Sequence, residues 1–290
     1  MCGGQFRFKS LFLAKTFPMS DETQVLSRRA RRISILNATV LYVLSFMMVH
    51  MVVLSITWFL STSLGIEARI LYNRVVFLTE YDYQIWTIDA IVAMFFAGPF
   101  IAIILAGFFS RLNTVNRFDQ GWSRMFYLYV FFHGVNFSFG ALMAGALSQE
   151  VLWYAFAWLR VPQIMMYFIG VGGLVAMFYL GQSKIMSIYE ASIFHRPNDS
   201  FNRQEWLLNA LLKAWLFGGI IIALVFIPGV QRYLIYLLIF PIVMFVPAFV
   251  RSRFIPEAVV IETQTHERIL WFPLILLILS LTLIRVFLVL

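Results

Sequence analysis

Two polar residues that could do chemistry stand inside a long apolar stretch of this sequence. His133 and Asn136 are three residues apart in FYLYVFFHGVNFSFGALMAGAL, so they share one face of a helix. A histidine at membrane depth can relay a proton or ligate a metal ion, and an asparagine beside it can contribute further hydrogen bonds. The same face continues with Gly140 and Ala144, beside Gly145. Small residues let helices approach closely, so we favour helix packing over a polar site here.

Two further ionisable residues fall within apolar stretches. His50 lies past the middle of the first stretch, and Lys213 lies about two turns into the fifth, one turn after Asn209. Lys213 can either extend to the membrane surface or meet the face that carries His133 and Asn136. If both histidine helices run along the membrane normal, His50 and His133 differ in depth by several ångströms. We therefore expect no metal site between them.

The sequence lacks the motifs that identify common enzymes and cofactor proteins. It contains no H-E-x-x-H, no G-x-x-x-x-G-K-[ST] and no G-x-S-x-G. The last apolar stretch has no lysine that could hold retinal, and Cys2 is the single cysteine. We therefore expect no cofactor, no metal and no nucleotide, and we favour a protein that is not an enzyme.

The elements that must position these residues are membrane-spanning helices. Of the 290 residues, 61% are hydrophobic and 12% are charged, whereas soluble domains have about 45–50% and 25%. Runs of about 20 apolar residues can cross a bilayer, and these runs lack the alternation of barrel strands. The expected fold class is all-α, a polytopic transmembrane helical bundle with about seven spans. The spans are expected at 35–60, 87–109, 125–147, 162–183, 206–228, 232–250 and 270–290.

Lysine and arginine residues between the spans predict the orientation. The N-terminal tail and the connections on its side of the membrane hold 16 of them, and the connections on the other side hold 4. Because such residues concentrate in the cytoplasm, we expect the N-terminus inside and the C-terminus outside. The net charge of +8 is spread between spans. It therefore favours contact with the lipid bilayer over binding of nucleic acid.

We divide the chain into a basic cytoplasmic tail at 1–34 and a single transmembrane domain at 35–290. The sequence from Met19 would make an ordinary start for a membrane protein, so we hypothesise that translation begins there. The compact build favours a multi-pass protein of a bacterial cytoplasmic (inner) membrane. Thr87 is placed to cap a helix, and the aromatic segment 149–161 predicts a short interfacial or re-entrant helix on the outer side.

Small residues predict which helices pack together. Gly170, Gly173 and Gly181 occur in the fourth span, and this stripe suits the small face of the third span at Gly140. We therefore predict that the third and fourth helices form a close pair. Gly140→Leu or Gly173→Leu should impair folding.

Three functions remain open. The favoured one is a non-catalytic scaffold, assembly factor or complex subunit that packs against other membrane proteins, because the loops are short and reactive groups are few. The second is a small-molecule transporter or permease with a polar site near His133, Asn136 and Lys213. Helix breaks at Gly98-Pro99, in the glycines of the fourth span or at Pro241 would support it. The third is a membrane-embedded enzyme that uses His133 on a lipid.

Overall fold

A computed structural model describes residues 21–80, 84–115, 121–191, 207–227, 229–251 and 268–287, without the side chains of 21–28, 30, 189–190 and 285–287. The predicted start at Met19 and the first 20 residues of the basic tail lie outside these ranges. The helices are α1 (Asp21–Ser63), α2 (Ile88–Val115), α3 (Gly121–Val135), α4 (Ala141–Ser148), α5 (Leu152–Trp158), α6 (Gln163–Ser183), α7 (Ile185–Glu190), α9 (Ala214–Val225), α10 (Arg232–Ile239), α11 (Pro241–Arg251) and α12 (Trp271–Phe287). Two segments are π-helical, η1 (Asn136–Gly140) and η2 (Leu208–Lys213), and two strands, β1 (Ala68–Ile70) and β2 (Val75–Phe77), form an antiparallel hairpin.

The predicted all-α membrane fold is confirmed. Within the described residues, six helices are long and apolar enough to cross a membrane: Arg31–Ser63, Ile88–Val115, Gly121–Ser148, Gln163–Ser183, Leu208–Val225 and Arg232–Arg251. The region of the seventh predicted span holds α12, an apolar helix of which the structure describes 17 residues. The count of seven and the orientation stay predictions.

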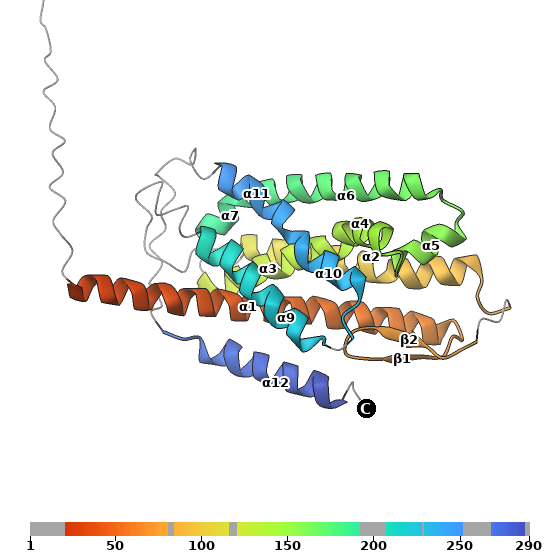
Figure 1. Ribbon diagram of the computed structural model, residues 1–290, viewed down its shortest axis with the longest axis horizontal. Helices are drawn as coiled ribbons and strands as arrows, with labels where there is room; N and C mark the ends of the chain where they lie inside the picture. Colours follow the sequence, from red (N-terminus) through yellow and green to blue (C-terminus); the bar gives the residue numbers. More distant parts are fainter. Residues whose placement is uncertain are drawn as a thin grey trace, which may run out of the picture.

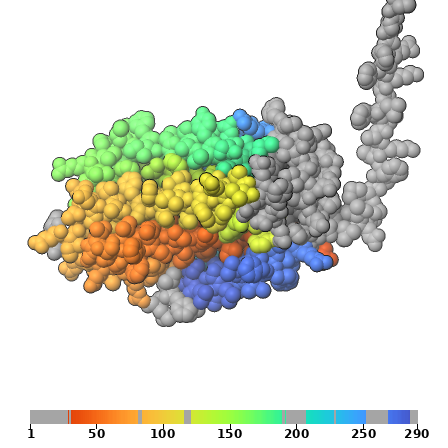
Figure 2. Space-filling model, turned by 180° about the vertical axis from the view of Figure 1, so that it is seen from behind, coloured from red at the N-terminus to blue at the C-terminus, as the bar shows by residue number. Residues whose placement is uncertain are grey.

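The bundle is organised around α1. Figure 1 shows α6 along one edge of the bundle and α12 along the opposite edge, where it packs on α1. Figure 2, seen from behind, shows α12 (blue) and α6 (green) on opposite sides of α1 and α2. The largest fully buried side chains include Tyr42 and Phe46 of α1 and Tyr129 and Phe132 of α3. The core therefore lies where α1 and α3 meet.

Local signals in the sequence set several helix ends. Thr87 Oγ1 accepts the Ala90 N–H at 3.2 Å, so the predicted cap at the start of α2 is confirmed. Gly98 and Pro99 lie inside α2, and the glycines of the fourth span lie inside α6, so neither place is a helix break. Pro241, in contrast, begins α11 directly after the turn at Phe240.

Glycines decide how closely the helices approach. A Cβ added at Gly173 would lie 2.6 Å from Phe139 O, and one at Gly170 would lie 2.9 Å from Met143 Cα. The third and fourth spans are therefore in backbone contact, as their small residues predict. Gly181 differs, because it lies against Met244 of α11 rather than against the third span.

The small residues Gly140 and Gly145 of the third span contact different helices. A Cβ at Gly140 would lie 3.3 Å from Met177 Sδ of α6, and it would also overlap the side chain of Asn136. Ala144 is fully buried. A Cβ at Gly145 would lie 3.1 Å from Leu152 Cβ, so Gly145 serves the contact with α5 and not the contact with α6.

Candidate functional site at the predicted outer end

His133 and Asn136 are buried between helices, and both contact backbone carbonyl oxygens. His133 Nε2 lies 3.2 Å from Tyr42 O of α1, and Asn136 Nδ2 donates to Leu237 O of α10 at 2.6 Å. Pro241 has no N–H to offer to the carbonyl four residues earlier, which is that of Leu237. Asn136 therefore supplies the donor that the proline removes, and both side chains join helices.

The two π-helical segments include predicted site residues, because η1 begins at Asn136 and η2 ends at Lys213. Such segments often occur at functional sites. Lys213 Nζ donates to Asn209 Oδ1 at 2.7 Å. The hydroxyl of Tyr129, one turn before His133, donates to Ala210 O of η2. Tyr129 thus ties η2 to α3.

His50 lies apart from these residues, where α1 meets the turn between β1 and β2. Its Nε2 is 3.3 Å from Tyr72 O, and its ring centroid lies 5.2 to 5.9 Å from those of three phenylalanine rings. The next residue of the turn, Asn73, donates from Nδ2 to Gly229 O at 2.5 Å. The hairpin is therefore tied both to α1 and to the connection between α9 and α10.

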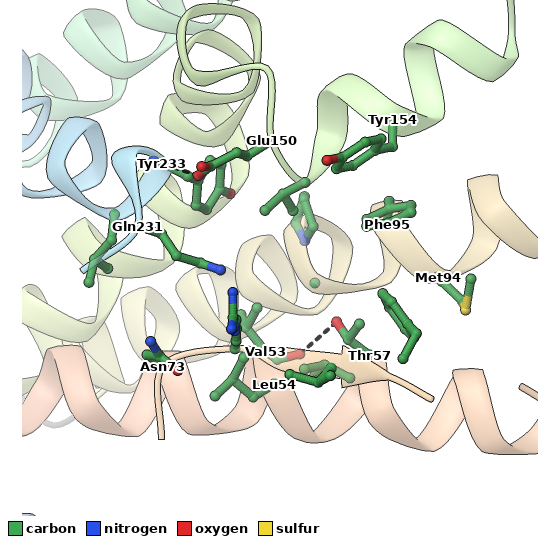
Figure 3. Close-up of a pocket in the computed structure, with 18 of the residues that line it drawn as sticks. Val53, Leu54, Thr57, Asn73, Met94, Phe95, Glu150, Tyr154, Gln231 and Tyr233 are labelled. Carbon is green, nitrogen blue, oxygen red and sulfur yellow. Dashed lines mark hydrogen bonds between the residues drawn. The ribbon is translucent and has the colours of Figure 1, made fainter. Parts of the chain in front are cut away.

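A cavity of about 440 Å³ opens beside His50. Residues of α1, α2, α5 and α10, the hairpin and the connection before α5 line it. Figure 3 shows Thr57 and Leu54 of α1 on one side, Glu150 and Tyr154 on the opposite side, and Gln231 extending into the space between. Its volume is within the range of about 300–1,000 Å³ that is usual for small-molecule sites. We call this cavity the outer pocket, since it lies at the predicted outer end of the bundle.

Glu150 reaches the outer pocket from a strained connection. Its Oε2 accepts the Tyr233 N–H at 3.0 Å, in the first turn of α10, where the helix dipole favours a carboxylate. The residues on either side, Gln149 and Val151, have φ of 59° and 54°. A β-branched residue rarely adopts such a conformation, which costs on the order of 1–3 kcal/mol. Strain of this kind concentrates at functional sites. The strained backbone around Glu150 therefore makes the outer pocket a candidate site.

The outer pocket could not be identified from the sequence. Of the predicted site residues, His50 lines it, whereas His133, Asn136 and Lys213 do not. The short helix predicted in the aromatic segment 149–161 is confirmed as α5, and its position on the outer side stays a prediction. Glu150 lies in the same segment and was not among the predicted site residues. The sequence contains two signals that could have indicated the pocket. One is the acid Glu150 beside aromatic residues, and the other is Asn73 in a different connection. Only the fold brings the two together.

The composition of the wall is typical of a ligand pocket. In the part of the chain that the structure describes, no three histidine, cysteine, aspartate or glutamate side chains are grouped so that they could hold a metal ion. The wall is largely apolar, with a few polar groups from separate elements. Comparison with protein families, with curated protein sequences and with solved structures finds no match to this chain.

Proposed function

We propose that this membrane protein binds a small solute in the outer pocket, as a solute-binding or transport protein of a bacterial cytoplasmic membrane with its N-terminus inside. The observation that carries the proposal is the cavity of about 440 Å³, whose wall includes the buried polar side chains of His50 and Asn73. Polar side chains in a membrane domain are costly and are kept mainly for packing or function. His133 and Asn136 serve packing, whereas His50 and Glu150 line a space.

The turn at Phe240 and Pro241, which interrupts the span between α10 and α11, supports this proposal. Tyr233, Leu234 and Leu237 of α10 line the outer pocket, and α11 packs on α6 at Gly181. Transporters commonly place their sites beside such discontinuous helices. A solute in the outer pocket would therefore contact the segment directly before this turn.

A second candidate, the subunit or scaffold of a membrane complex, is favoured by α12. This helix lies at the edge of the bundle, and most of its large apolar side chains are exposed, among them Trp271, Phe272 and Ile278. Lipid or another membrane protein would cover them. Native mass spectrometry of protein extracted gently from its own membrane tests this candidate, because a scaffold should retain a partner reproducibly.

The outer pocket is expected to be open to water from outside. In a Cys2→Ser background, the only thiol can be placed in the pocket by Thr57→Cys, a nearly isosteric change. We expect a membrane-impermeant maleimide added from outside to label Thr57→Cys in intact cells at least about tenfold faster than Ser138→Cys. Ser138 lines a groove on the apolar flank between α1, α2 and η1, so lipid should cover it.

Two outcomes contradict the proposal. Equal labelling of the two variants would mean that the pocket is no more accessible to water than the lipid-facing groove. Labelling of Thr57→Cys only in inside-out vesicles would mean that the pocket faces the cytoplasm, and the predicted orientation would be wrong. Rates are compared on variants whose thermal unfolding in detergent matches that of the Cys2→Ser parent.

A further inference from the structure

Two side chains that line the outer pocket each carry a buried hydrogen-bond acceptor without a partner among the described residues. His50 is 4% exposed, and its Nδ1 has no hydrogen bond. Because a carbonyl oxygen can only accept, the contact with Tyr72 O places the ring proton on His50 Nε2. In the neutral ring Nδ1 is then an acceptor with nothing to accept from.

Asn73 provides the second free acceptor. It is 8% exposed, its Nδ2 donates to Gly229 O, and its Oδ1 has no hydrogen bond. Both Asn73 and His50 line the same cavity. A buried polar atom without a partner costs about 1–3 kcal/mol, so a ligand that donates hydrogen bonds here would recover that energy.

The rest of the wall favours a positive charge on the donor group. Glu150 contributes a carboxylate, which has roughly four lone-pair sites for hydrogen bonds. The Tyr233 N–H occupies one of these sites. Trp86, Tyr154 and Trp158 present aromatic rings, which attract cations and pack against apolar groups. Arg74, the one arginine or lysine among the described lining residues, is exposed, so solvent screens it more than the buried acceptors.

We propose that the outer pocket binds a small amine, whose ammonium group donates to His50 Nδ1 and Asn73 Oδ1 in the field of Glu150 and whose apolar body packs on the aromatic wall. This inference rests on the proposed function, since it names the class of solute that the same pocket takes. A carboxylate of equal size would face two acceptors and Glu150, so the pocket rejects it.

Protection of the Thr57→Cys thiol tests the proposal with three matched probes, 2-phenylethylamine, 2-phenylethanol and 3-phenylpropanoate. We expect the amine to slow maleimide labelling about tenfold at saturation, and we expect the carboxylate to leave the rate unchanged. The alcohol, which donates one hydrogen bond and carries no charge, should protect only at about tenfold higher concentration. Glu150→Gln should bring the amine and the alcohol to similar half-protecting concentrations.

His50→Gln tests the acceptor His50 Nδ1. The Gln amide nitrogen can still donate to Tyr72 O, whereas the acceptor at the Nδ1 position is lost. This variant should raise the half-protecting concentration of the amine about tenfold, with each rate compared with that of the same variant in the absence of a probe. Equal protection by amine and carboxylate, or no protection by any probe, would overturn the amine proposal and leave an open pocket. If Thr57→Cys does not react at all, the proposed function fails and the amine proposal fails with it.

Discussion

Gly181→Ala is expected to destabilise the folded protein by roughly 3 kcal/mol or more, although it adds a single methyl group. A Cβ at Gly181 would overlap Met244 O and lie 2.7 Å from Met244 Cα, so it meets backbone and not a flexible side chain. α6 and α11 would have to separate along their contact. Overpacking usually costs about 1–3 kcal/mol, and a rigid neighbour puts this position at or above the upper end.

Gly172→Ala is the matched control, since nothing lies within 4 Å of a Cβ at Gly172 in the same helix. It should be neutral or stabilising by up to about 1 kcal/mol, because alanine favours a helix more than glycine does. Gly173→Ala should fall between the two, with its Cβ 2.6 Å from Phe139 O. Reversible unfolding in mixed detergent micelles measures all three variants. Similar unfolding free energies for Gly181→Ala and Gly172→Ala would show that α6 and α11 do not pack as described.

The helical spans could be predicted from the sequence because the bilayer imposes one simple requirement. Every backbone N–H and C=O within the membrane needs a hydrogen bond from the protein itself. A helix makes these bonds within one segment, so long apolar runs fold as helices. The close approach of the third and fourth spans also follows from a local pattern, the glycine stripe of α6 at Gly170 and Gly173. In both cases the information lies within a few turns of one helix.

The outer pocket could not be predicted in the same way, because its wall is assembled from segments far apart in the sequence. Asn73 and Glu150 are 77 positions apart, and each is an ordinary polar residue in a short connection. The partner of Gly181 was missed for the same reason, since α11 follows α6 only after a long stretch of chain. His50 could be singled out because an ionisable residue in an apolar run is rare. The role of His50 depends on its contact with Tyr72 O. A helical pattern in the sequence does not predict that contact, because Tyr72 lies in the hairpin and not in α1.

Asn136→Ala should lower the free energy of unfolding by about 2 kcal/mol, and the loss should shrink in the presence of Pro241→Ala. In the native chain Asn136 Nδ2 is the donor to Leu237 O, to which Pro241 can offer no N–H. Removing that donor leaves a buried carbonyl oxygen without a partner, which costs about 1–3 kcal/mol. Restoring a backbone N–H at position 241 would let the helix satisfy the same oxygen.

The double-mutant cycle separates this account from simple loss of packing. We expect Asn136→Ala to cost about 1 kcal/mol less in the Pro241→Ala background than alone, a coupling within the range seen for residues that share a hydrogen-bond network. A matched cycle of Asn136→Ala with Pro247→Ala should show no coupling, since Pro247 lies in the same span but removes the donor from a different carbonyl. If the two cycles agree, Asn136 is not replacing the proline's missing donor. Its burial would then need another explanation, and the assignment of Asn136 to packing rather than to a solute site would have to be reopened.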